Sequence, residues 1–447
     1  MASTRLSKTL GTPTDNKKWT WSAWIKRSTS FNVEQRIFYA INGSNYTTLQ
    51  FDDESNLIFF NEISGVGTDM LLKTTQLFRD AGAWYNIVIA YDSANSTAAD
   101  RQIIYINGER VTSFVTENTA TVNANTAINQ AVPHTVGSSN GGGNYFNGLM
   151  THVHFVDGTA YTATSFGSVD STSGIWKSNT SPSVTYGNNG FFLKMKNSGA
   201  MGTDSSGKSN NFTVNGTLTQ NIDTPDNNFA TMNPLDNYWQ GGTFSNGNNT
   251  VVTGNSGYAR NSSTIGMSTG KWYSEYKVGS ITGSGGIYIG ITGDLATAAS
   301  GNTGNSAFSY AYDSDGTKHF NGSASSFGDS YTTGDIIGVA LDTTNNKLWW
   351  SKNGVWQASG DPSNNSNPAY TVVASSLTTI GAYFWSFSDN NNGEYFTCNC
   401  NFGNGYFGTT AVTTNSGNGY AGTEGKSIFN YQPPTGYSAL STKGLNL

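Results

Sequence analysis

The segment that decides the fold class is residues 347–356, Lys-Leu-Trp-Trp-Ser-Lys-Asn-Gly-Val-Trp. Asn353-Gly354 fits the two positive-φ positions of a type I′ turn, a common two-residue connection in β-hairpins. A two-residue turn at this point would place Lys352 opposite Val355. Aromatic residues on both sides of such a turn favour antiparallel β-sheet. The segment therefore predicts a β-hairpin.

Side chains alternate along a strand, so Leu348 and Trp350 share one face of this hairpin. With Ser351 paired to Trp356, Trp349 and Trp356 form a diagonal aromatic pair on the opposite face. If the first pair faces the core, Trp349 and Trp356 point outward as a candidate ligand- or partner-binding platform. The interpretation we favour is that this pair is covered, by the second sheet, a C-terminal arm or a neighbouring subunit.

The same pattern of short strands extends along the whole chain. The Asn-Gly dipeptide occurs twelve times in 447 residues, and helical periodicity is almost absent. Glycine contributes 53 residues, and charged residues only 12%, against a usual share of about 25%. Aromatic residues make up 13%, too many for a disordered Gly/Ser/Asn polymer. These features predict an all-β protein with two tandem β-sandwich (jelly-roll) domains.

Composition shifts suggest where the domains end. The polar, proline-containing stretch 218–240 is expected to be a linker between a sandwich at 1–217 and another at 241–410. Further on, the chain is rich in Gly, Thr, Asn and Ala, and two prolines stiffen its last part. We expect residues 411–447 to form an extended C-terminal arm, ordered only by contact with a neighbouring domain or subunit.

Charge, hydropathy and cysteine content exclude several classes of partner. The formal net charge is −6, whereas nucleic-acid binding needs clustered Lys and Arg, so we expect no nucleic-acid partner. No run of about 18 apolar residues occurs, so we expect no membrane insertion. Residues 1–8 carry no apolar leader segment. Cys398 and Cys400 are too few for a disulfide framework, which together with the missing leader suggests assembly in a cytoplasm.

Residues that would carry catalysis or bind metal are sparse. A retaining glycosidase needs two carboxylates about 5–5.5 Å apart, but no Glu-x-Asp-x-x-Glu strand occurs, and Glu275 is expected at a solvent-facing strand position. His152 and His154 share a strand face, and we expect a structural role because no Cys or Glu lies near them. Asp204–Gly207 and Asp313–Gly316 lack the remaining spacing of a calcium loop, although calcium stays open there. We predict no enzyme, catalytic residue, metal site or cofactor.

The first half of the chain carries a family resemblance. A tryptophan-rich strand at 19–26 is followed by Trp-Tyr-Asn-Ile-Val-Ile-Ala-Tyr-Asp at 84–92, Ile-Tyr-Ile-Asn-Gly-Glu at 104–109 and Phe-Asn-Gly-Leu-Met at 146–150. This order of motifs resembles the laminin-G/concanavalin-A-like superfamily over residues 1–215. The resemblance implies a sandwich that binds glycans or proteins at sheet faces and loop rims, with calcium in some members.

The second half resembles a SPRY domain. Gly-Lys-Trp-Tyr-Ser-Glu-Tyr-Lys-Val at 270–278 is similar to the opening strand, and Ile-Gly-Ile at 289–291 to the next core strand. Residues 334–354 are similar to the central Gly-Asp-x-Ile-Gly and Ser-Lys-Asn-Gly hairpin, and Asn-Phe-Gly at 401–403 to the closing strand. This resemblance implies a protein-interaction module with no catalytic residues to carry over.

Other segments resemble virion proteins of tailed bacteriophages. They are Leu-Ser-Lys-Thr at 6–9, Tyr-Gly-Asn-Asn-Gly-Phe-Phe-Leu at 186–193, Asp-Ser-Ser-Gly at 204–207 and Asp-Asn-Asn-Phe-Ala-Thr-Met-Asn-Pro at 226–234. Together they look like appendage proteins, especially of marine phages, that join a laminin-G-like module to a SPRY module. The resemblance implies a non-enzymatic tail fibre, spike or capsid fibre that binds a host-surface glycan or protein.

Two other functions remain as alternatives. A purely structural virion component, such as a capsid decoration or baseplate-associated protein, would bury its apolar patches against neighbours, whereas a receptor binder would keep an exposed aromatic or carboxylate-lined rim. A secreted glycan-active enzyme is disfavoured by the missing acid pair and leader. We expect a virion location after assembly in the host cytoplasm, contacts with other virion proteins, and a cyclic homo-oligomer. The C-terminal arm is the candidate attachment to the particle.

Overall fold

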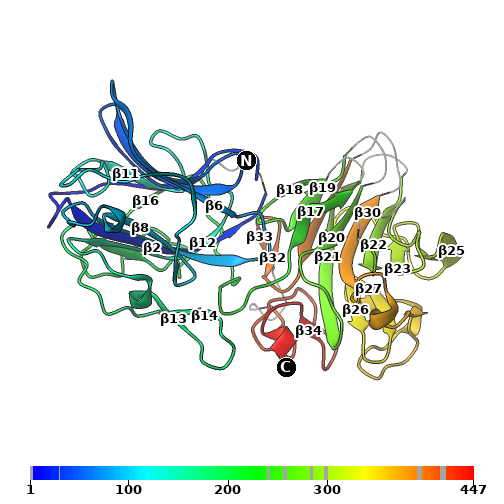
Figure 1. Cartoon of the computed structure of the whole chain (residues 1–447). Coiled ribbons are helices and arrows are strands. Elements are labelled where there is room, and N and C mark those ends of the chain that lie inside the picture. The colour runs from blue at the N-terminus through cyan, green and yellow to red at the C-terminus, as the bar shows by residue number, and fades with distance from the viewer. Residues whose placement is uncertain are drawn as a thin grey trace. The chain divides into compact units, whose positions relative to one another are not determined.

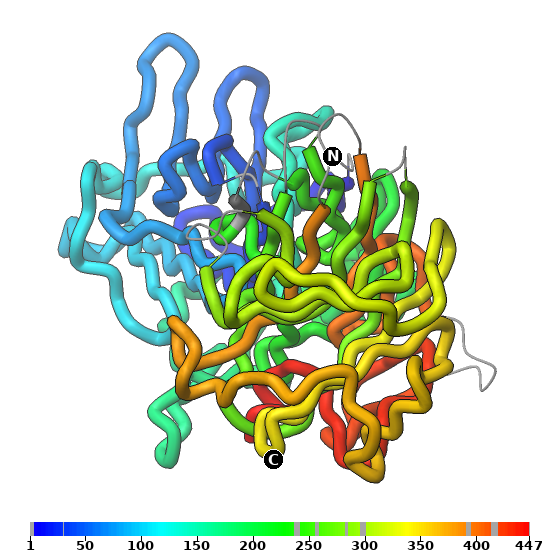
Figure 2. Tube along the Cα trace, turned by 90° about the vertical axis from the view of Figure 1, so that its right-hand side faces the viewer, coloured from blue at the N-terminus to red at the C-terminus, as the bar shows by residue number. Residues whose placement is uncertain are grey.

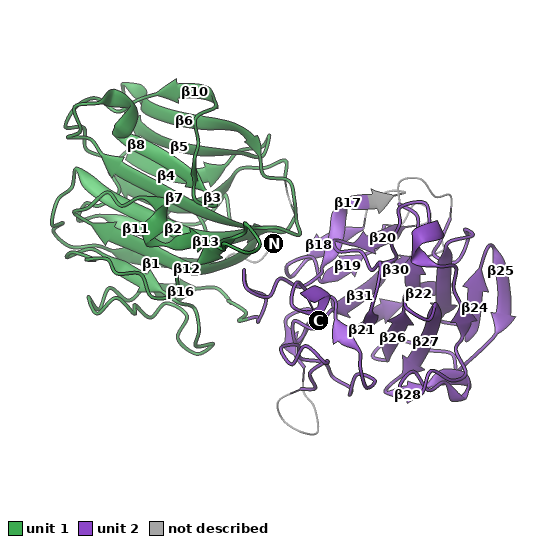
Figure 3. Cartoon of the chain, turned by 60° about the horizontal axis from the view of Figure 1, so that its bottom comes forward, with its two compact units in different colours: residues 1–220 green, residues 221–447 purple. Residues whose placement is uncertain are grey.

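The chain folds as two compact units of β-sheet, residues 1–220 and 221–447 (Figure 3). The computed structural model describes residues 4–29, 31–238, 242–254, 259–281, 285–295, 301–389, 395–412 and 419–446. Across these ranges every regular element is a β-strand or a short 3-10 turn, which confirms the all-β prediction. None of the described residues belongs to a helix with the length and hydropathy of a membrane span.

Unit 1 is a sandwich of two antiparallel sheets, which we call 1A and 1B (Figure 1). The strands of sheet 1A, in spatial order, are β10 (Phe114–Asn118), β6 (Gly67–Leu77), β5 (Asn56–Ile63), β4 (Asn45–Phe51), β3 (Gln35–Asn42), β11 (Pro133–Val136), β1 (Arg5–Thr9) and β16 (Thr213–Asn215). Those of sheet 1B are β15 (Phe191–Leu193), β12 (Gly148–Asp157), β2 (Lys18–Arg27), β7 (Trp84–Asp92), β8 (Gln102–Ile106) and β9 (Glu109–Arg110). Separate short elements are the hairpin of β13 (Gly167–Val169) and β14 (Trp176–Ser178) and the 3-10 turns η1 (Ala98–Asp100) and η2 (Ala163–Ser165).

The core of unit 1 lies between its two sheets and follows from strand alternation. In β2, Trp19, Trp21 and Ala23 share the face that points into the core, and all three are buried. Trp19 stacks on Tyr91 of β7 with ring centroids 5.1 Å apart. Phe38 of β3 packs on Trp21 from sheet 1A, with ring centroids 6.1 Å apart. Aromatic contacts therefore join the two layers.

Asp157, at the end of β12, ties three loops of unit 1 together. Its carboxylate accepts hydrogen bonds from the backbone N–H groups of Thr14 and Asn189, at 2.7 and 3.0 Å. The Asn129 side-chain amide donates another bond, at 2.8 Å. Asp157 is 2% exposed, so loss of its carboxylate would leave these donors without an acceptor in a buried place.

His134 of β11 is buried as a neutral imidazole. Its Nε2 accepts the backbone N–H of Asn129 at 3.1 Å, and its Nδ1 lies 2.8 Å from the Val132 carbonyl oxygen. Because Nε2 acts as an acceptor, the ring proton belongs on Nδ1, which donates to Val132. Burial lowers the pKa of His134 from 6.5 to about 4, although the Val132 carbonyl raises it. A second ring proton would set the Nε2–H group against the N–H of Asn129.

Unit 2 is a second sandwich, of sheets 2A and 2B. The strands of sheet 2A, in spatial order, are β17 (Met232–Tyr238), β20 (Arg260–Ser263), β30 (Phe384–Asp389), β22 (Ile287–Thr292), β23 (Ser309–Asp313), β24 (Thr317–Phe320) and β25 (Ser323–Ser326). Those of sheet 2B are β18 (Thr243–Ser245), β19 (Thr250–Val252), β31 (Phe396–Asn401), β21 (Lys271–Ile281), β26 (Ile336–Asp342), β27 (Lys347–Lys352) and β28 (Val355–Trp356), with β29 (Tyr370–Thr371) beside β27 and β34 (Ser438–Ala439) beside β21. The remaining elements are the hairpin of β32 (Tyr406–Phe407) and β33 (Thr410–Ala411) and the 3-10 turns η4 (Gln357–Ser359), η5 (Ser375–Leu377) and η6 (Gly444–Asn446).

The hairpin at 347–356 has the register that its turn predicts. β27 pairs with β28 so that Ser351 lies opposite Trp356. The Asn and Gly of the turn have φ values of 49° and 81°, both positive as a type I′ turn requires. Leu348 and Trp350 point into the core between sheets 2A and 2B and have no exposed surface.

The boundary between the units differs from the predicted linker at 218–240. Unit 2 begins at Asn221, and Phe229, Ala230 and Met232 are each buried in one of its clusters. The last two residues of the predicted linker lie outside the described residues. The three buried apolar side chains anchor this polar stretch to unit 2. Most of the predicted linker is therefore part of unit 2.

The C-terminal residues were expected to form an extended arm that a neighbouring domain or subunit would order. Residues 419–446 contain β34, which pairs in parallel with β21, and η6. They lie on unit 2 itself, as the red end of the chain beside β34 shows in Figure 1, so the domain that orders them is the one preceding them in the sequence. We call residues 419–446 the strap. Residues 413–418 and 447 of the predicted arm lie outside the described residues.

Candidate binding surfaces

The predicted platform residues, Trp349 and Trp356, lie on the outer face of sheet 2B. Trp349 is only 1% exposed, whereas Trp356 is half-buried. The Trp349 indole N–H donates to the Ser366 carbonyl at 2.8 Å. Trp356 lies edge-on to Tyr273, with ring centroids 6.3 Å apart. The structure thus brings both tryptophans to one face, but Trp349 offers no surface to a ligand.

The strap belongs to the buried cluster that includes Trp349, and the loop with Gly360 and Ser366 lies against Trp349 itself. Phe429, Tyr437 and Ala439 of the strap belong to the same buried cluster as Tyr273 and Trp349. Phe429 meets Tyr273 edge to face, with ring centroids 4.9 Å apart. Ala439 lies opposite Tyr273 in the parallel pairing of β34 with β21. Unit 2 therefore carries a partial third layer over sheet 2B.

Glu275 corrects a sequence prediction, because a solvent-facing residue was expected and Glu275 is fully buried. Its direction follows strand alternation, since it points to the outer face of sheet 2B together with Tyr273. That face is covered by the strap and not by water. The prediction failed because the covering segment is far from Glu275 in sequence.

Four hydrogen-bond donors surround the Glu275 carboxylate. The backbone N–H groups of two successive strap residues, Asn430 and Tyr431, donate to Oε2 and Oε1 at 2.8 and 2.7 Å. The Tyr273 hydroxyl and the Asn401 side-chain amide donate at 3.2 Å each. Burial raises the pKa of Glu275 from 4.5 to about 7, although the two backbone N–H groups lower it. The carboxyl group therefore holds the strap backbone at Asn430 and Tyr431 against sheet 2B.

A second aromatic surface, which the sequence analysis missed, lies on the outer face of sheet 1A. Tyr46 packs against Tyr39 and against Phe60, with ring centroids 5.6 Å apart in both pairs. The Arg36 guanidinium lies over the rings of Tyr39 and Tyr46, 4.7 and 5.2 Å from their centroids, as in a cation–π contact. Arg36, Tyr46 and Phe60 are partly exposed. We call these four residues the aromatic surface of unit 1.

The strand register explains why these side chains share one side of the sheet. Tyr39 lies opposite Thr48 of β4, and Thr48 lies opposite Phe60 of β5. Their neighbours Phe38 and Phe59 point the other way, into the core. The two hairpins that carry the aromatic surface, β3–β4 and β5–β6, are the two blue loops that extend from unit 1 in Figure 2.

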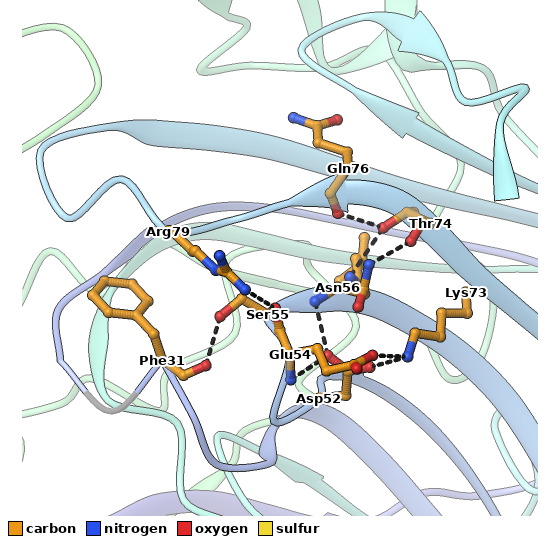
Figure 4. A network of polar contacts seen from close by, with 10 residues as sticks. Phe31, Asp52, Glu54, Ser55, Asn56, Lys73, Thr74, Gln76 and Arg79 are labelled. Atoms are coloured by element: carbon orange, nitrogen blue, oxygen red, sulfur yellow. Dashed lines mark hydrogen bonds and ion pairs between the residues drawn. The ribbon is translucent and has the colours of Figure 1, made fainter. Parts of the chain in front are cut away.

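Lys73 of β6 lies on the same face and fixes a turn at one end of it. Its ammonium group lies 2.8 Å from Asp52 Oδ2 and 2.6 Å from Glu54 Oε2 (Figure 4). Asp52 also accepts the backbone N–H of Asn56 at 2.8 Å. These contacts raise the pKa of Lys73, with the Asp52 hydrogen bond as the largest cause. The charge of Lys73 is thus neutralised within the protein and leaves Arg36 as the cation beside the aromatic rings.

Structural contacts occupy the histidines and one of the turns considered for metal binding. His152 and His154 both lie against the Phe192 ring, at centroid distances of 5.9 and 3.9 Å. His154 is buried and its Nδ1 lies 2.9 Å from the Tyr186 hydroxyl. The Asp204 carboxylate accepts three backbone N–H groups at 2.8 Å each. These side chains hold loops and strands together.

The other candidates are placed in similar ways. Asp313 lies 3.4 Å from His319 Nε2. Cys398 and Cys400 are free thiols that point into the core of unit 2 from the same face of β31. In the part of the chain that the structure describes, no three His, Cys, Asp or Glu side chains gather as a metal site would require.

Comparison with known proteins agrees with the two folds. Residues 4–165 match the concanavalin A-like lectin/glucanases superfamily, and residues 271–376 match the SPRY domain. No curated protein matches the chain. Among solved structures, the SPRY domain of human HERC1 is similar at 16% identity over 38% of this chain and 96% of that one, with a TM-score of 0.29. Domains LG4-5 of the mouse laminin alpha1 chain are similar at 11% identity over 89% and 86%, with a TM-score of 0.27.

A pentraxin of the horseshoe crab Limulus polyphemus is a further similar structure, at 15% identity over 36% of this chain and 72% of that one, with a TM-score of 0.26. At such scores the likeness to individual structures carries no argument about function. The family matches define the class: a concanavalin A-like, laminin G-type domain followed by a SPRY domain. Both are binding folds that are typically non-enzymatic, which suggests a binding role for the chain.

Proposed function

We propose that this chain is a non-enzymatic appendage protein of a tailed-phage virion, a tail fibre, spike or capsid fibre, that binds a host-surface glycan or protein. Support comes from the pairing of two binding modules and from a chain with only 12% charged residues. The observation that carries the proposal is the partly exposed aromatic surface of unit 1. The protein is assembled in the host cytoplasm and resides in the virion.

The chemistry of this surface suits a carbohydrate. Tyr46 and Phe60 offer ring faces to the C–H groups of a sugar. Arg36 offers hydrogen-bond donors beside them, and Glu62, opposite Tyr46 across the strands, offers an acceptor. A few polar groups around an apolar patch fix a ligand's orientation and so provide specificity.

Such a site is small, and its affinity as a single copy is expected to be weak. A homo-oligomer that presents several copies gains affinity through effective concentration, without any new contact. Closed cyclic symmetry is common among oligomers and would point equivalent surfaces toward the same cell. Contacts with other virion proteins would then use other parts of the surface.

The test is the binding of fluorescently labelled oligomeric protein to a panel of marine bacterial cells, with and without periodate oxidation of their surface sugars. We expect binding that periodate abolishes and that falls at least about tenfold in the Tyr46→Ala/Phe60→Ala double variant. The matched control is Tyr395→Ala, which removes a tyrosine that is 48% exposed in unit 2. It should bind as the unmodified protein does.

Two results would count against parts of this proposal. Periodate-sensitive binding that the double variant retains would place the receptor site elsewhere on the chain and leave the function standing. No binding by an oligomeric sample to any cell would favour the second candidate, a purely structural virion component. The observation that favours that candidate is the burial of Trp349 within the protein's own outer layer on sheet 2B.

A further inference from the structure

Strand β25 is an uncovered edge of unit 2. It ends sheet 2A and, among the described strands, pairs only with β24 (Figure 3). Its four residues, Ser-Ala-Ser-Ser at 323–326, are all exposed. An edge strand keeps a row of N–H and C=O groups that its own sheet does not use, and such a row is a template for another strand. The outer side of β25 is therefore open to pairing with a second chain.

The turn before β25 determines which of its backbone groups face outward. Residues 321–322 connect β24 to β25 with φ values of 50° and 73°, the positive pair of a type I′ turn. In such a turn the N–H of the next residue, Ser323, bonds back to the preceding strand. Bonded and non-bonded pairs alternate along an antiparallel ladder. Ser325 therefore also bonds to β24, whereas Ala324 and Ser326 direct their N–H and C=O groups away from it.

Other edges of the two sandwiches carry features that limit pairing. β9 consists of the charged pair Glu109–Arg110, and β10 contains Glu117 and a register shift. β17 contains Pro234 and Asp236. β15 is buried, and β16, β18 and β28 have only two or three residues. β25 has four residues, no charge, no proline and a continuous register with β24.

The lysine of this hairpin does not protect the edge. Lys318 of β24 donates to the Ala369 carbonyl at 2.7 Å and lies over the Tyr370 ring, 4.6 Å from its centroid. Its ammonium group is thus engaged within unit 2. The side chains of β25 are small and neutral, so no like charges come together when the strand meets itself about a twofold axis. This self-compatibility points to a second copy of the chain as the partner.

We propose that two copies of this chain pair through their β25 strands, antiparallel about a twofold axis at Ser325, so that sheet 2A continues from one copy into the other. In this register Ala324 lies opposite Ser326 of the partner subunit, and each of the two residues donates its N–H and accepts a bond at its C=O. Ser325 lies opposite Ser325 of the partner subunit in a non-hydrogen-bonded pair. The interface is isologous, because both copies contribute the same strand. It concerns unit 2 and does not depend on the function proposed for unit 1.

The test is a disulfide trap in the full chain. Residues that face each other in a non-hydrogen-bonded pair have Cα atoms about 4.5 Å apart, a distance that a disulfide can span. We therefore expect Ser325→Cys to form a disulfide-linked dimer under mild oxidation. Ser323→Cys is the matched control, because it is also exposed on β25 but would place the two thiols about 13 Å apart along the strands. The native Cys398 and Cys400 are buried and should not interfere.

Dimerisation without a crosslink is measured by sedimentation equilibrium. Ala324→Pro removes one outward N–H from each copy and leaves the bonds between β24 and β25 in place, since β24 does not use that N–H. We expect this variant to raise the dimer dissociation constant at least about tenfold. Ala324→Ser keeps the N–H and should dimerise as the unmodified protein does.

Three results would overturn the proposal. The first is no more disulfide-linked dimer in Ser325→Cys than in Ser323→Cys, a comparison that needs no proline variant to fold. The second is an oligomer whose dissociation constant is the same in Ala324→Pro, because another surface would then hold the copies together. The third is an unmodified chain that stays monomeric up to about 100 µM.

Discussion

Replacing Trp349 distinguishes packing from ligand binding on the outer face of sheet 2B. The side chain is 1% exposed and belongs to a buried cluster that includes Phe429 and Tyr437 of the strap. Truncation of a buried tryptophan to alanine costs about 3–5 kcal/mol, and the Ser366 carbonyl also loses its donor at 2.8 Å, for about 1 kcal/mol more. We therefore expect Trp349→Ala to lower the free energy of unfolding of unit 2 by about 4–6 kcal/mol. Trp356→Ala, at a half-buried position, should cost about 1–2 kcal/mol.

The assay is urea unfolding with pulsed hydrogen exchange and mass spectrometry, which reports each unit through its own peptides. Unit 1 serves as the internal control and should unfold at an unchanged urea concentration in both variants. The reasoning is refuted if Trp349→Ala changes the free energy of unfolding of unit 2 by less than about 1 kcal/mol and yet abolishes cell binding. That combination would make Trp349 a contact residue for a ligand and not part of a packed layer.

Two further predictions concern unit 1. In the folded state His134 has a pKa of about 4, whereas in the unfolded chain its pKa is about 6.5. Because the unfolded state binds the proton first as the pH falls, the free energy of unfolding of unit 1 should decrease by up to about 3 kcal/mol between pH 6.5 and pH 4. Urea unfolding midpoints measured across this pH range should show the decrease. If the stability of His134→Gln depends on pH just as steeply, His134 is not the group responsible. Asp157→Asn places an amide donor among the donors of Thr14 and Asn189 and should cost about 2–3 kcal/mol in urea unfolding. Asp53→Asn, at an exposed site, is the control and should leave the free energy of unfolding unchanged. If both variants lose the same stability, the role given to Asp157 is refuted.

The parts of the fold that depend on local rules were predictable from the sequence. The register at Asn353-Gly354 follows from the length of the turn, and alternation then puts Leu348 and Trp350 on one face, which the structure shows to be the core side. Alternation likewise puts Trp19 and Trp21 on one face of β2, and the structure shows that this face is buried. In each case a two-residue period and a two-residue turn act over a few positions, and no distant segment is needed to decide the outcome.

The parts that failed depend on distant segments. Alternation correctly places Glu275 on the outer face of sheet 2B. However, no residue near position 275 in the sequence indicates that Asn430 and Tyr431 will cover it. The strap has little regular structure, so no periodicity reveals which of its side chains are buried. Phe229 was likewise hidden in a polar stretch that looked like a linker.

The aromatic surface of unit 1 was missed for a different reason. Residues 57–60, Leu-Ile-Phe-Phe, are apolar at every position, so the pattern does not show which side faces the core. The structure assigns Leu57 and Phe59 to the core and leaves Ile58 and Phe60 partly exposed. The available signal was the pair of tyrosines at 39 and 46 around the Asn42-Gly43 dipeptide, but it identifies neither Phe60 nor Arg36.

The position of the strap in the chain has a consequence for biosynthesis. Unit 1 closes when β16, at Thr213–Asn215, pairs with β1, so it can fold while the rest of the chain is still being translated. Unit 2 draws Leu440 into its core and Tyr437 into its outer layer, so it cannot finish folding until residue 440 has emerged from the ribosome. A ribosome that stalls before residue 440 would therefore hold a finished first domain and a second one whose outer aromatic layer is incomplete and open to other nascent chains.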